Sequence, residues 1–290
     1  MNLVQLKYFE AVCVYKSVSA AAERLHISQP SLSCAIKELE KEFGTRLFKR
    51  QHKGMALTTE GEELLKLSRA LLSHANEVER IMSDLGEGRK LLRLGVPPMI
   101  GSLTLPKIFR EFQSIHSEIQ IEILEAGTKE LVKLLQENRV DMVLLPHNTP
   151  FDNSVRSMEV AHFEVVYCRS AKNNALKNNR VKATDIEGEK IVLFKDSFFQ
   201  TEEIKKWFSV SGVKPNILLQ TDQLSTLLNI VSDGVASGFM FRQLIQPKTG
   251  LTPLSMEPPL NLTVSLVWNA QATLYNPMKC FIKYMKEFSL

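Results

Sequence analysis

The sequence has no long uninterrupted run of apolar residues. Its first twelve residues already include Lys7 and Glu10 within an amphipathic pattern, which does not fit a secretory signal. No other segment approaches the roughly 20 apolar residues of a membrane-spanning helix. We therefore expect a cytoplasmic protein that has no membrane partner.

Cysteines, histidines and the signatures of common enzymes are also sparse. The four cysteines lie far apart and form no CxxC pair, which argues against a zinc site or a disulfide framework; they are Cys13, Cys34, Cys168 and Cys280. The six histidines do not cluster. The sequence contains no GxSxG, P-loop, HExxH or dinucleotide-binding motif. We therefore expect no catalytic residues, no metal site and no cofactor, and hence not an enzyme.

Glycine and proline are too few, at 13 and 12, for a collagen-like or long disordered segment. The 290 residues, 44% of them hydrophobic, exceed what one compact core usually holds, so we expect two or three domains. The net charge of +4 is uneven, because residues 1–58 carry nine basic and five acidic side chains, whereas the other 232 residues carry 27 of each. A basic head on a neutral body suits a polyanion partner, although many other domains have basic patches.

The first 43 residues predict three helices. Leu3, Leu6, Phe9 and Cys13 recur at helical spacing along the first helix. Ser19 can cap a short second helix over Ala20–Leu25, and residues 26–28 form a tight turn. Ser28 is a plausible N-cap of a third helix that has Pro30 in its first turn.

The third helix has two distinct faces. An apolar face packs into the domain and consists of Leu32, Ile36, Leu39 and Phe43. The opposite face is small and polar at its N-terminal end and cationic further along; it carries Gln29, Pro30, Ser33, Lys37 and Lys41, with Ser31 on its flank. A major groove admits slender polar side chains near base edges and cations near phosphates. A polar helix face alone is often merely solvated, but the order helix, tight turn, helix favours a DNA-binding motif.

Two short strands, 46–50 and 55–58, are predicted around a turn that holds Lys53 and Gly54. We expect this hairpin to be a basic wing beside the third helix. Thr59 and Glu62 have the spacing of a capping box and begin a long helix. Its leucine-rich positions repeat every seven residues, at Leu64, Leu71, Val78 and Leu85, which predicts dimerisation between helices. An amphipathic helix packed only on its own domain remains the alternative.

From Leu91 onward, short apolar strands alternate with helices, as in an α/β domain with largely parallel strands. The predicted strands are 91–96, 119–124, 140–145, 163–168, 190–194, 216–220, 237–241 and 261–268. The predicted helices begin near Ser102 and Thr128, span 201–211 and 222–233 with Asp222 as N-cap and Gly234 as the stop, and close the chain at 277–288. These strands and helices fall into two similar sets, which we expect to form two α/β lobes. Two lobes of this kind imply a hinged cleft in which helix N-termini face a ligand.

Residues 17–65 carry a family resemblance: SVSAAAERLHISQPSLSCAIKELEKEFGTRLFKRQHKGMALTTEGEELL resembles the head of LysR-type transcriptional regulators along its whole length. The alanine pair, the Ser-Gln-Pro start of the third helix, the Phe-Gly-x-x-Leu-Phe-x-Arg corner and the Leu-Thr-x-x-Gly exit occur in the same order. The resemblance implies that Gln29, Pro30, Ser31, Ser33 and Lys37 lie against the major groove and that Arg50 contacts the DNA backbone near the wing. Lys53, a charge at the tip of the predicted hairpin, is placed to touch the DNA backbone or minor groove. The resemblance also implies subunit pairing through 59–87 and a tetramer. Cys34 departs from the larger polar residue often found there.

The body resembles the LysR effector domain and periplasmic binding proteins, less specifically than the head does. The resemblance implies a cleft near 97–102, 127–128, Pro146, 194–198 and Thr221. Our candidate effector-binding residues are Ser102, Thr128, Lys195, Ser197 and Thr221. Hydroxyls at helix starts favour a small anion, although Ser102 and Thr128 are equally plausible as plain N-caps. Pro97-Pro98-Met99 replaces the hydroxyls common in the family, so no relative supplies the ligand's identity.

These patterns together predict an α/β protein with an N-terminal all-α winged helix-turn-helix at 1–58 and a linker helix at 59–90. They also predict a two-lobed, periplasmic-binding-protein-like effector domain at 91–290, with lobe I about 91–160 and 266–290 and lobe II about 161–265. The expected function is a sequence-specific transcription regulator modulated by a small anionic metabolite. The expected partners are an operator in double-stranded DNA, the effector and further copies of the chain, with RNA polymerase as a candidate. An enzyme, a solute-binding protein and a helix-turn-helix regulator of another family are the rival interpretations.

Overall fold

A computed structural model describes residues 1–51, 54–87, 90–172, 179–245 and 250–288. The chain separates into two compact units, Met1–Ser83 and Asp84–Leu290, which we describe one at a time. None of the helices within the described ranges is long and apolar enough to cross a membrane.

Unit 1 begins with three helices that surround one small core. They are α1 (Leu3–Tyr15), α2 (Val18–Arg24) and α3 (Gln29–Phe43). Ser28 caps α3 as predicted, because its hydroxyl accepts the Ser31 N–H, and Pro30 lies in the first turn. Phe9, Leu32 and Leu39 are fully buried where the three helices meet. The alanine pair Ala21 and Ala22 is buried in the same core, since small side chains let helices approach closely.

The start of α2 differs from the prediction. Ser17, and not Ser19, is the N-cap: its backbone is extended and its hydroxyl accepts the Ala20 N–H at 3.3 Å. Ser19 lies inside the first turn of α2, where its hydroxyl points to another helix. Both serines satisfy the sequence preference for an N-cap, so the choice depends on where the chain leaves α1.

The hairpin and the long helix follow. They are β1 (Phe48–Gln51), β2 (Gly54–Leu57) and α4 (Thr59–Glu87). The expected Thr59–Glu62 capping box is wrong, because Thr58 is the residue whose hydroxyl accepts the Gly61 N–H at 3.0 Å. The same hydroxyl donates to the Arg46 carbonyl at 2.7 Å. Thr58 therefore joins the end of the hairpin to the start of α4.

Unit 2 contains one continuous sheet of nine described strands. They are β3 (Leu91–Val96), β4 (Gln120–Glu125), β5 (Met142–His147), β6 (Val155–Ser170), β7 (Arg180–Val181), β8 (Lys190–Phe194), β9 (Asn216–Thr221), β10 (Ser237–Phe241) and β11 (Leu251–Asn269). The strand order is β4-β3-β5-β11-β6-β10-β8-β9, and β7 pairs with β11. The strand triplets β4-β3-β5 and β10-β8-β9 are each parallel.

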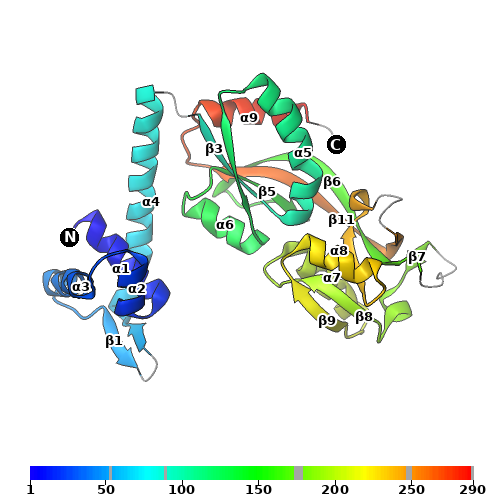
Figure 1. Cartoon of the computed structure of the whole chain (residues 1–290), viewed down its shortest axis with the longest axis horizontal. Coiled ribbons are helices and arrows are strands. Elements are labelled where there is room, and N and C mark those ends of the chain that lie inside the picture. The colour runs from blue at the N-terminus through cyan, green and yellow to red at the C-terminus, as the bar shows by residue number, and fades with distance from the viewer. Residues whose placement is uncertain (52–53, 88–89, 173–178, 246–249, 289–290) are drawn as a thin grey trace. The chain divides into compact units, whose positions relative to one another are not determined.

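Two long strands join two lobes. β6 and β11 run antiparallel from Leu251↔Ser170 to Asn269↔Val155. β5 pairs with the C-terminal half of β11, and β10 pairs with the C-terminal half of β6, so each half-sheet is attached to opposite ends of the same ribbon (Figure 1). In lobe I, β11 pairs with β5 from Thr263 to Val267. The sequence prediction had found only the most apolar part of β6 and β11.

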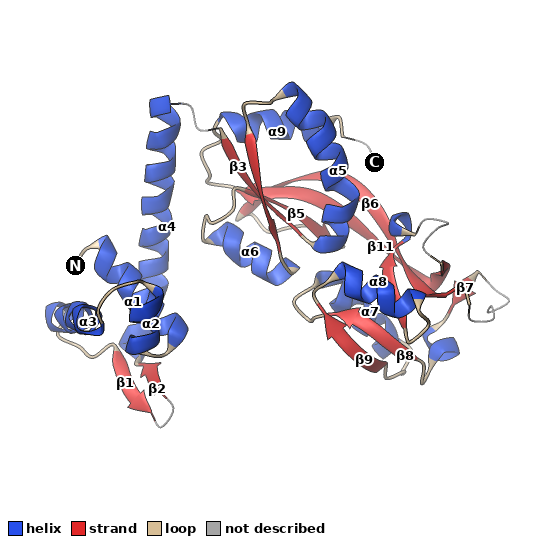
Figure 2. Cartoon of the chain, in the orientation of Figure 1, coloured by secondary structure: helices blue, strands red, loops and turns tan. Residues whose placement is uncertain are grey.

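The helices of unit 2 cover the two half-sheets. They are α5 (Pro98–Ile115), α6 (Thr128–Gln136), α7 (Phe199–Val210), α8 (Leu224–Ser232) and α9 (Asn276–Lys286), with short 3₁₀ turns η1 (Ala183–Ile186) and η2 (Arg242–Leu244). In lobe I, α5 and α9 lie on one face of the sheet and α6 on the other (Figure 2). Phe112 and Phe281 pack edge-on under α5 and α9, with ring centroids 5.2 Å apart. Leu131 and Leu135 fill a separate core beneath α6.

Two predicted helix starts in unit 2 are wrong. α5 begins at Pro98, four residues before Ser102, because proline is favoured at the first helical position. The N-cap of α8 is Gln223, not Asp222, and no side chain caps that helix. Gly234 ends α8 as expected, with a φ of +75° that glycine adopts without steric cost.

Candidate nucleic-acid interface and ligand site

The exposed face of α3 carries the residues predicted to read DNA. Gln29, Pro30, Ser31 and Lys37 are exposed, and Ser33 is half-buried, while Leu32, Ile36 and Leu39 on the opposite face are buried. Lys41 extends the same exposed face by one turn. Cys34 is exposed at the edge of this face, and its thiol contacts Oε1 of Glu38 at 3.8 Å. The structure therefore brings the predicted α3 residues together on one side of one helix.

Two hydrogen bonds fix the N-terminal end of this face. The Ser28 and Ser31 hydroxyls lie 2.7 Å apart, which fixes the Ser31 side chain against the cap. The Ser19 hydroxyl donates to Oε1 of Gln29 at 3.1 Å. Because that bond uses the amide oxygen, the amide nitrogen of Gln29 keeps its two donors for another partner. The helix end thus presents an oriented amide and not a freely rotating one.

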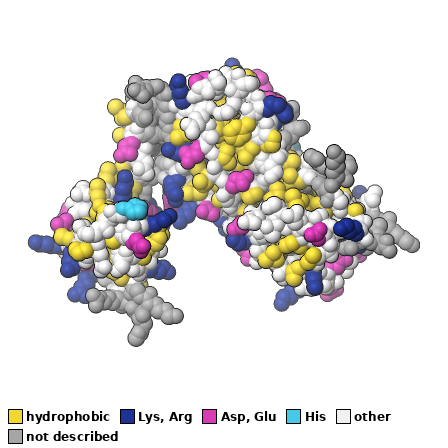
Figure 3. Space-filling view, viewed as in Figure 1, with side chains coloured by type: hydrophobic (Ala, Val, Ile, Leu, Met, Phe, Trp, Pro, Cys, Tyr) yellow, Lys and Arg dark blue, Asp and Glu magenta, His cyan; other side chains and the backbone are white. Residues whose placement is uncertain are grey.

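The hairpin is attached to the helices beside α3. The Glu40 carboxylate, on α3, accepts the backbone N–H of Leu47 at 2.8 Å and of Phe48 at 3.4 Å. The Met55 N–H donates to the Lys16 carbonyl at 3.1 Å. Arg50 lies in β1, but its side chain is outside the described part, and Lys53 lies outside the described residues altogether. Lys and Arg side chains protrude from the face of unit 1 seen in Figure 3.

The long helix α4 has two apolar faces. Leu64 and Leu65 pack against the core of unit 1, and Ser68 and Leu72 are buried further along the helix. A second face remains exposed and carries Leu67, Leu71, Val78 and Met82, with exposed fractions of 52%, 46%, 60% and 61%. At 100° per residue these four side chains fall within a narrow stripe. Of the four predicted heptad positions, Leu71 and Val78 lie on this exposed face, Leu64 packs against the core of unit 1, and the Leu85 side chain is outside the described part.

In unit 2, the C-terminal ends of the parallel strands of both lobes meet at one seam. The loop after β8 lies against the start of α6, so Thr128 and Ser197 are close neighbours. The Lys129 N–H donates to the Ser197 carbonyl at 3.0 Å, and the Phe199 N–H donates to the Thr128 hydroxyl at 3.3 Å. We call the Gly127–Lys129 and Ser197–Phe199 segments the clasp. Two of the five predicted effector residues thus bind the opposite lobe directly.

The other three predicted residues lie at or near the seam in different settings. Lys195 and Thr221 are adjacent on lobe II, where the Lys195 N–H donates to the Thr221 carbonyl at 2.9 Å. The Lys195 ammonium pairs with the Asp222 carboxylate, and the hydrogen bond that it donates lowers the pKa of the Asp222 carboxyl. Ser102 lies in the second turn of α5, and its hydroxyl donates to the Pro98 carbonyl at 2.9 Å. Lys195 and Ser102 are therefore already engaged by neighbouring groups.

Several seam residues were missed from the sequence. Gln200 is 4% exposed, and its amide nitrogen donates to the sulfur of Met99 at 3.3 Å, across the seam. The Asn148 amide donates to Glu203 at 2.6 Å, and Lys129 pairs with Glu202. A signal existed, because Gln200, Glu203 and Trp207 recur at the spacing of one buried helix face. Two polar residues on such a face indicate a polar contact with another element.

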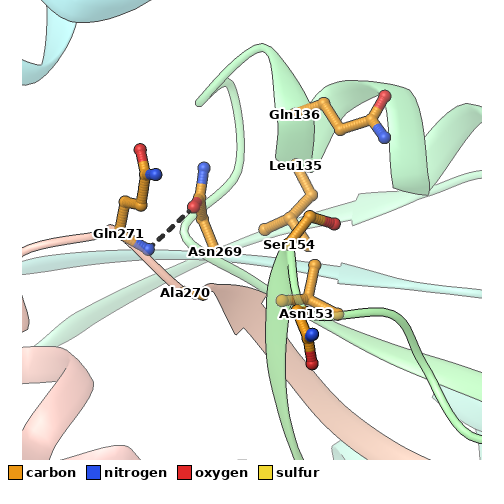
Figure 4. A pocket seen from close by; sticks show the side chains of 8 residues that line it. Leu135, Gln136, Asn153, Ser154, Asn269, Ala270 and Gln271 are labelled. Carbon is orange, nitrogen blue, oxygen red and sulfur yellow. Dashed lines mark hydrogen bonds between the residues drawn. The ribbon is translucent and has the colours of Figure 1, made fainter.

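A separate pocket of about 250 Å³ lies in lobe I at the opposite end of the sheet from the seam (Figure 4). It is lined by the end of α6 and the adjoining ends of β6 and β11: Leu135, Gln136, Asn153, Ser154, Val155, Asn269, Ala270 and Gln271. The Gln271 N–H donates to Asn269 Oδ1 at 3.0 Å. None of the predicted effector residues lines this pocket.

Comparison with known proteins assigns both units. A family model described as a bacterial regulatory helix-turn-helix protein of the lysR family matches residues 3–62, and the LysR substrate binding domain matches residues 85–289. The RuBisCO operon transcriptional regulator of Allochromatium vinosum is 37% identical over 146 residues, which span 50% of this chain and 48% of that protein. The regulator CzcR of Bacillus subtilis is 24% identical and aligns over 99% of this chain and 98% of its own length.

The fold is also shared with a solved regulator. The structure of full-length CbnR complexed with its target DNA covers 99% of each chain, with a TM-score of 0.67 and 19% identity. This similarity extends over both units and bears out the predicted order of a winged helix-turn-helix, a linker helix and a two-lobed α/β domain. The chain therefore belongs to the LysR family of DNA-binding transcription regulators, with a helix-turn-helix head followed by a substrate-binding domain.

Proposed function

We propose that this protein recognises a specific operator through the exposed face of α3 and that a small molecule held at the lobe seam changes its activity. The observation that carries the first part is the oriented, polar and cationic face formed by Gln29, Ser33 and Lys37 on a helix whose other face is buried. Such a face offers amide and hydroxyl groups to base edges and an ammonium to phosphate. CbnR, a protein of similar fold, is described with its target DNA.

The ligand class follows from the seam. The N-termini of α6 and α7 both open there, and helix N-termini favour negatively charged or oxygen-rich groups. Three lysines near the seam are paired with acids: Lys129 with Glu202, Lys195 with Asp222 and Lys205 with Asp196. A small metabolite with a carboxylate or carbonyl oxygen suits this setting. Ser197 and Thr128 remain our candidates for its first contacts.

The proposed assembly is a dimer in which the α4 helices of two subunits pair. Each subunit then has three parts: the head at 1–58, the linker helix at 59–90 and the effector domain at 91–290. The exposed stripe of Leu67, Leu71, Val78 and Met82 supports it, because four large apolar side chains on one helix gain most when another helix covers them. Tetramers would need contacts of the effector domain as well.

The decisive experiment is selection of bound sequences from a random duplex library with the full-length chain. We expect one enriched site with two related half-sites, since a symmetric dimer reads a symmetric operator. A Gln29→Ala/Lys37→Ala variant is the matched control and should enrich no such site. The same chain is then screened against small metabolites by thermal shift. A ligand at a hundred times its dissociation constant stabilises the bound form by about 2.7 kcal/mol. An unenriched library would contradict the DNA assignment, and a screen without a stabilising anion would contradict the ligand class.

A further inference from the structure

The two helices that meet at the seam lack side-chain caps of their own. The N-cap residues are Gly127 for α6 and Phe198 for α7, and neither provides a capping side chain. The first N–H groups of a helix have no partner within that helix, and leaving them unpaired when buried is costly. Each helix therefore needs an acceptor from elsewhere in the chain.

Each lobe supplies the acceptor that the other lobe lacks. The Ser197 carbonyl of lobe II accepts from Lys129, and the Thr128 hydroxyl of lobe I accepts from Phe199. Thr128 is only 8% exposed, so its hydroxyl has little access to water as an alternative partner. Moreover, a helix N-terminus carries a partial positive charge, so an oxygen atom bound to its N–H groups is stabilised there. The exchange of caps thus favours contact between the lobes.

Gly127 makes this contact possible for a reason unrelated to its own conformation. Its backbone angles, φ −67° and ψ 153°, are accessible to any residue. A Cβ atom at this position, however, would lie 2.5 Å from Oγ, 2.8 Å from Cβ and 3.0 Å from the carbonyl oxygen of Ser197. These atoms all belong to lobe II. An alanine would be tolerated within lobe I but not against the closed lobe II.

We propose that the clasp is the device that holds the two lobes closed. When the lobes separate, the Lys129 and Phe199 N–H groups both lose their acceptors, so the two hydrogen bonds report on the closed contact together.

The first test needs no ligand and uses hydrogen exchange on the full-length chain. In Gly127→Ala, exchange at the Lys129 and Phe199 amides should rise by about tenfold or more, because both lose an acceptor when the lobes part. Exchange within β3 and β8 should stay as in the wild type. Adding Ser197→Gly removes the two side-chain atoms that clash and should restore most of the protection. Unchanged exchange at both amides in Gly127→Ala would overturn the proposal, as would a failure of Ser197→Gly to rescue it.

Thr128→Val provides an independent arm, since it keeps the side-chain shape and removes one acceptor. We expect faster exchange at Phe199 and a smaller change at Lys129. If the amides of β3 and β8 lose as much protection against exchange as those of Lys129 and Phe199 in both variants, the lobes themselves unfold. That result would also overturn the clasp.

Discussion

The Ser19 hydroxyl of α2 donates to the Gln29 amide oxygen of α3 at 3.1 Å, so the first helix of the motif orients the leading side chain of the second. We expect Gln29→Ala to reduce discrimination against a substituted base by about 0.5–1.5 kcal/mol, since a hydrogen bond from the remaining amide N–H groups to a base edge contributes about that much. Ser19→Ala should have a smaller effect of the same kind. Competition binding between the selected operator and its single-base variants measures both. Uniform weakening across all sequences would show that Gln29 contacts phosphate and not a base.

Lys37 is expected to act mainly through charge. Its side chain is exposed on α3, eight residues along from Gln29. Lys37→Ala should lower the slope of log affinity against log salt by about 0.9 if it neutralises one phosphate. The matched control is Lys279→Ala, an exposed lysine on α9 in the other unit. Equal slopes for Lys37→Ala and the wild type would remove Lys37 from the interface. The same titration applied to Arg50→Ala tests the predicted wing contact.

The exposed stripe on α4 predicts a specific loss of assembly. A Leu71→Glu/Val78→Glu variant should be monomeric, because two carboxylates would be desolvated between the paired helices. Light scattering coupled to size exclusion measures the mass. Lys66→Glu, an exposed charge change on the same helix, should leave the mass unchanged. A wild-type mass for the double variant would favour the alternative of an amphipathic helix that serves its own domain only.

The thiols should differ strongly in reactivity. Burial raises the pKa of Cys13 to about 12 and that of Cys168 even further, so both stay protonated and unreactive near neutral pH. Cys34 is exposed on α3, at the edge of the face that carries Lys37. Iodoacetamide should therefore label Cys34 first and abolish operator binding by steric obstruction, whereas Cys34→Ser should bind the operator before and after treatment. Peptide mass spectrometry identifies the labelled residue, and early labelling of Cys13 would contradict its burial.

Lobe II contains an ion pair that predicts an acid-dependent stability. Hydrogen bonds from the Arg242 guanidinium at 2.5 and 3.2 Å lower the pKa of Glu164 below its usual value. A carboxyl whose pKa is lower in the folded state stabilises that state above its unfolded pKa of about 4.3, and this contribution is lost as the pH falls. Glu164→Gln should therefore lower the melting temperature at pH 7 by more than at pH 3.

The matched control for this measurement is Glu159→Gln, an exposed carboxyl on the same strand. It should change the melting temperature little at either pH. A difference between wild type and Glu164→Gln that stays constant from pH 7 to pH 3 would show that the carboxylate charge does not contribute to stability, and that the substitution acts through packing alone.

Local signals account for most of what the sequence predicted. Ser28 and Pro30 located the start of α3, the apolar period separated its buried face from its exposed face, and Gly234 located the end of α8. The predictions failed where two equivalent local signals competed: Ser17 and Ser19 both suit an N-cap, as do Thr58 and Thr59. At Ser102 the hydroxyl suggested a helix start, but the preceding proline pair moved that start four residues earlier.

The sequence by itself determined the family, the order of the elements and the face of α3 offered to DNA, because each depends on spacing within a few turns of chain. The tertiary structure alone decided what Thr128 and Ser197 do. Thr128 and Phe199 are 71 positions apart, and no local period relates them. Their contact exists because β6 and β11 carry two half-sheets whose strand ends meet. At that seam the N–H groups of Lys129 and Phe199, at the starts of α6 and α7, donate to oxygen atoms of the opposite lobe.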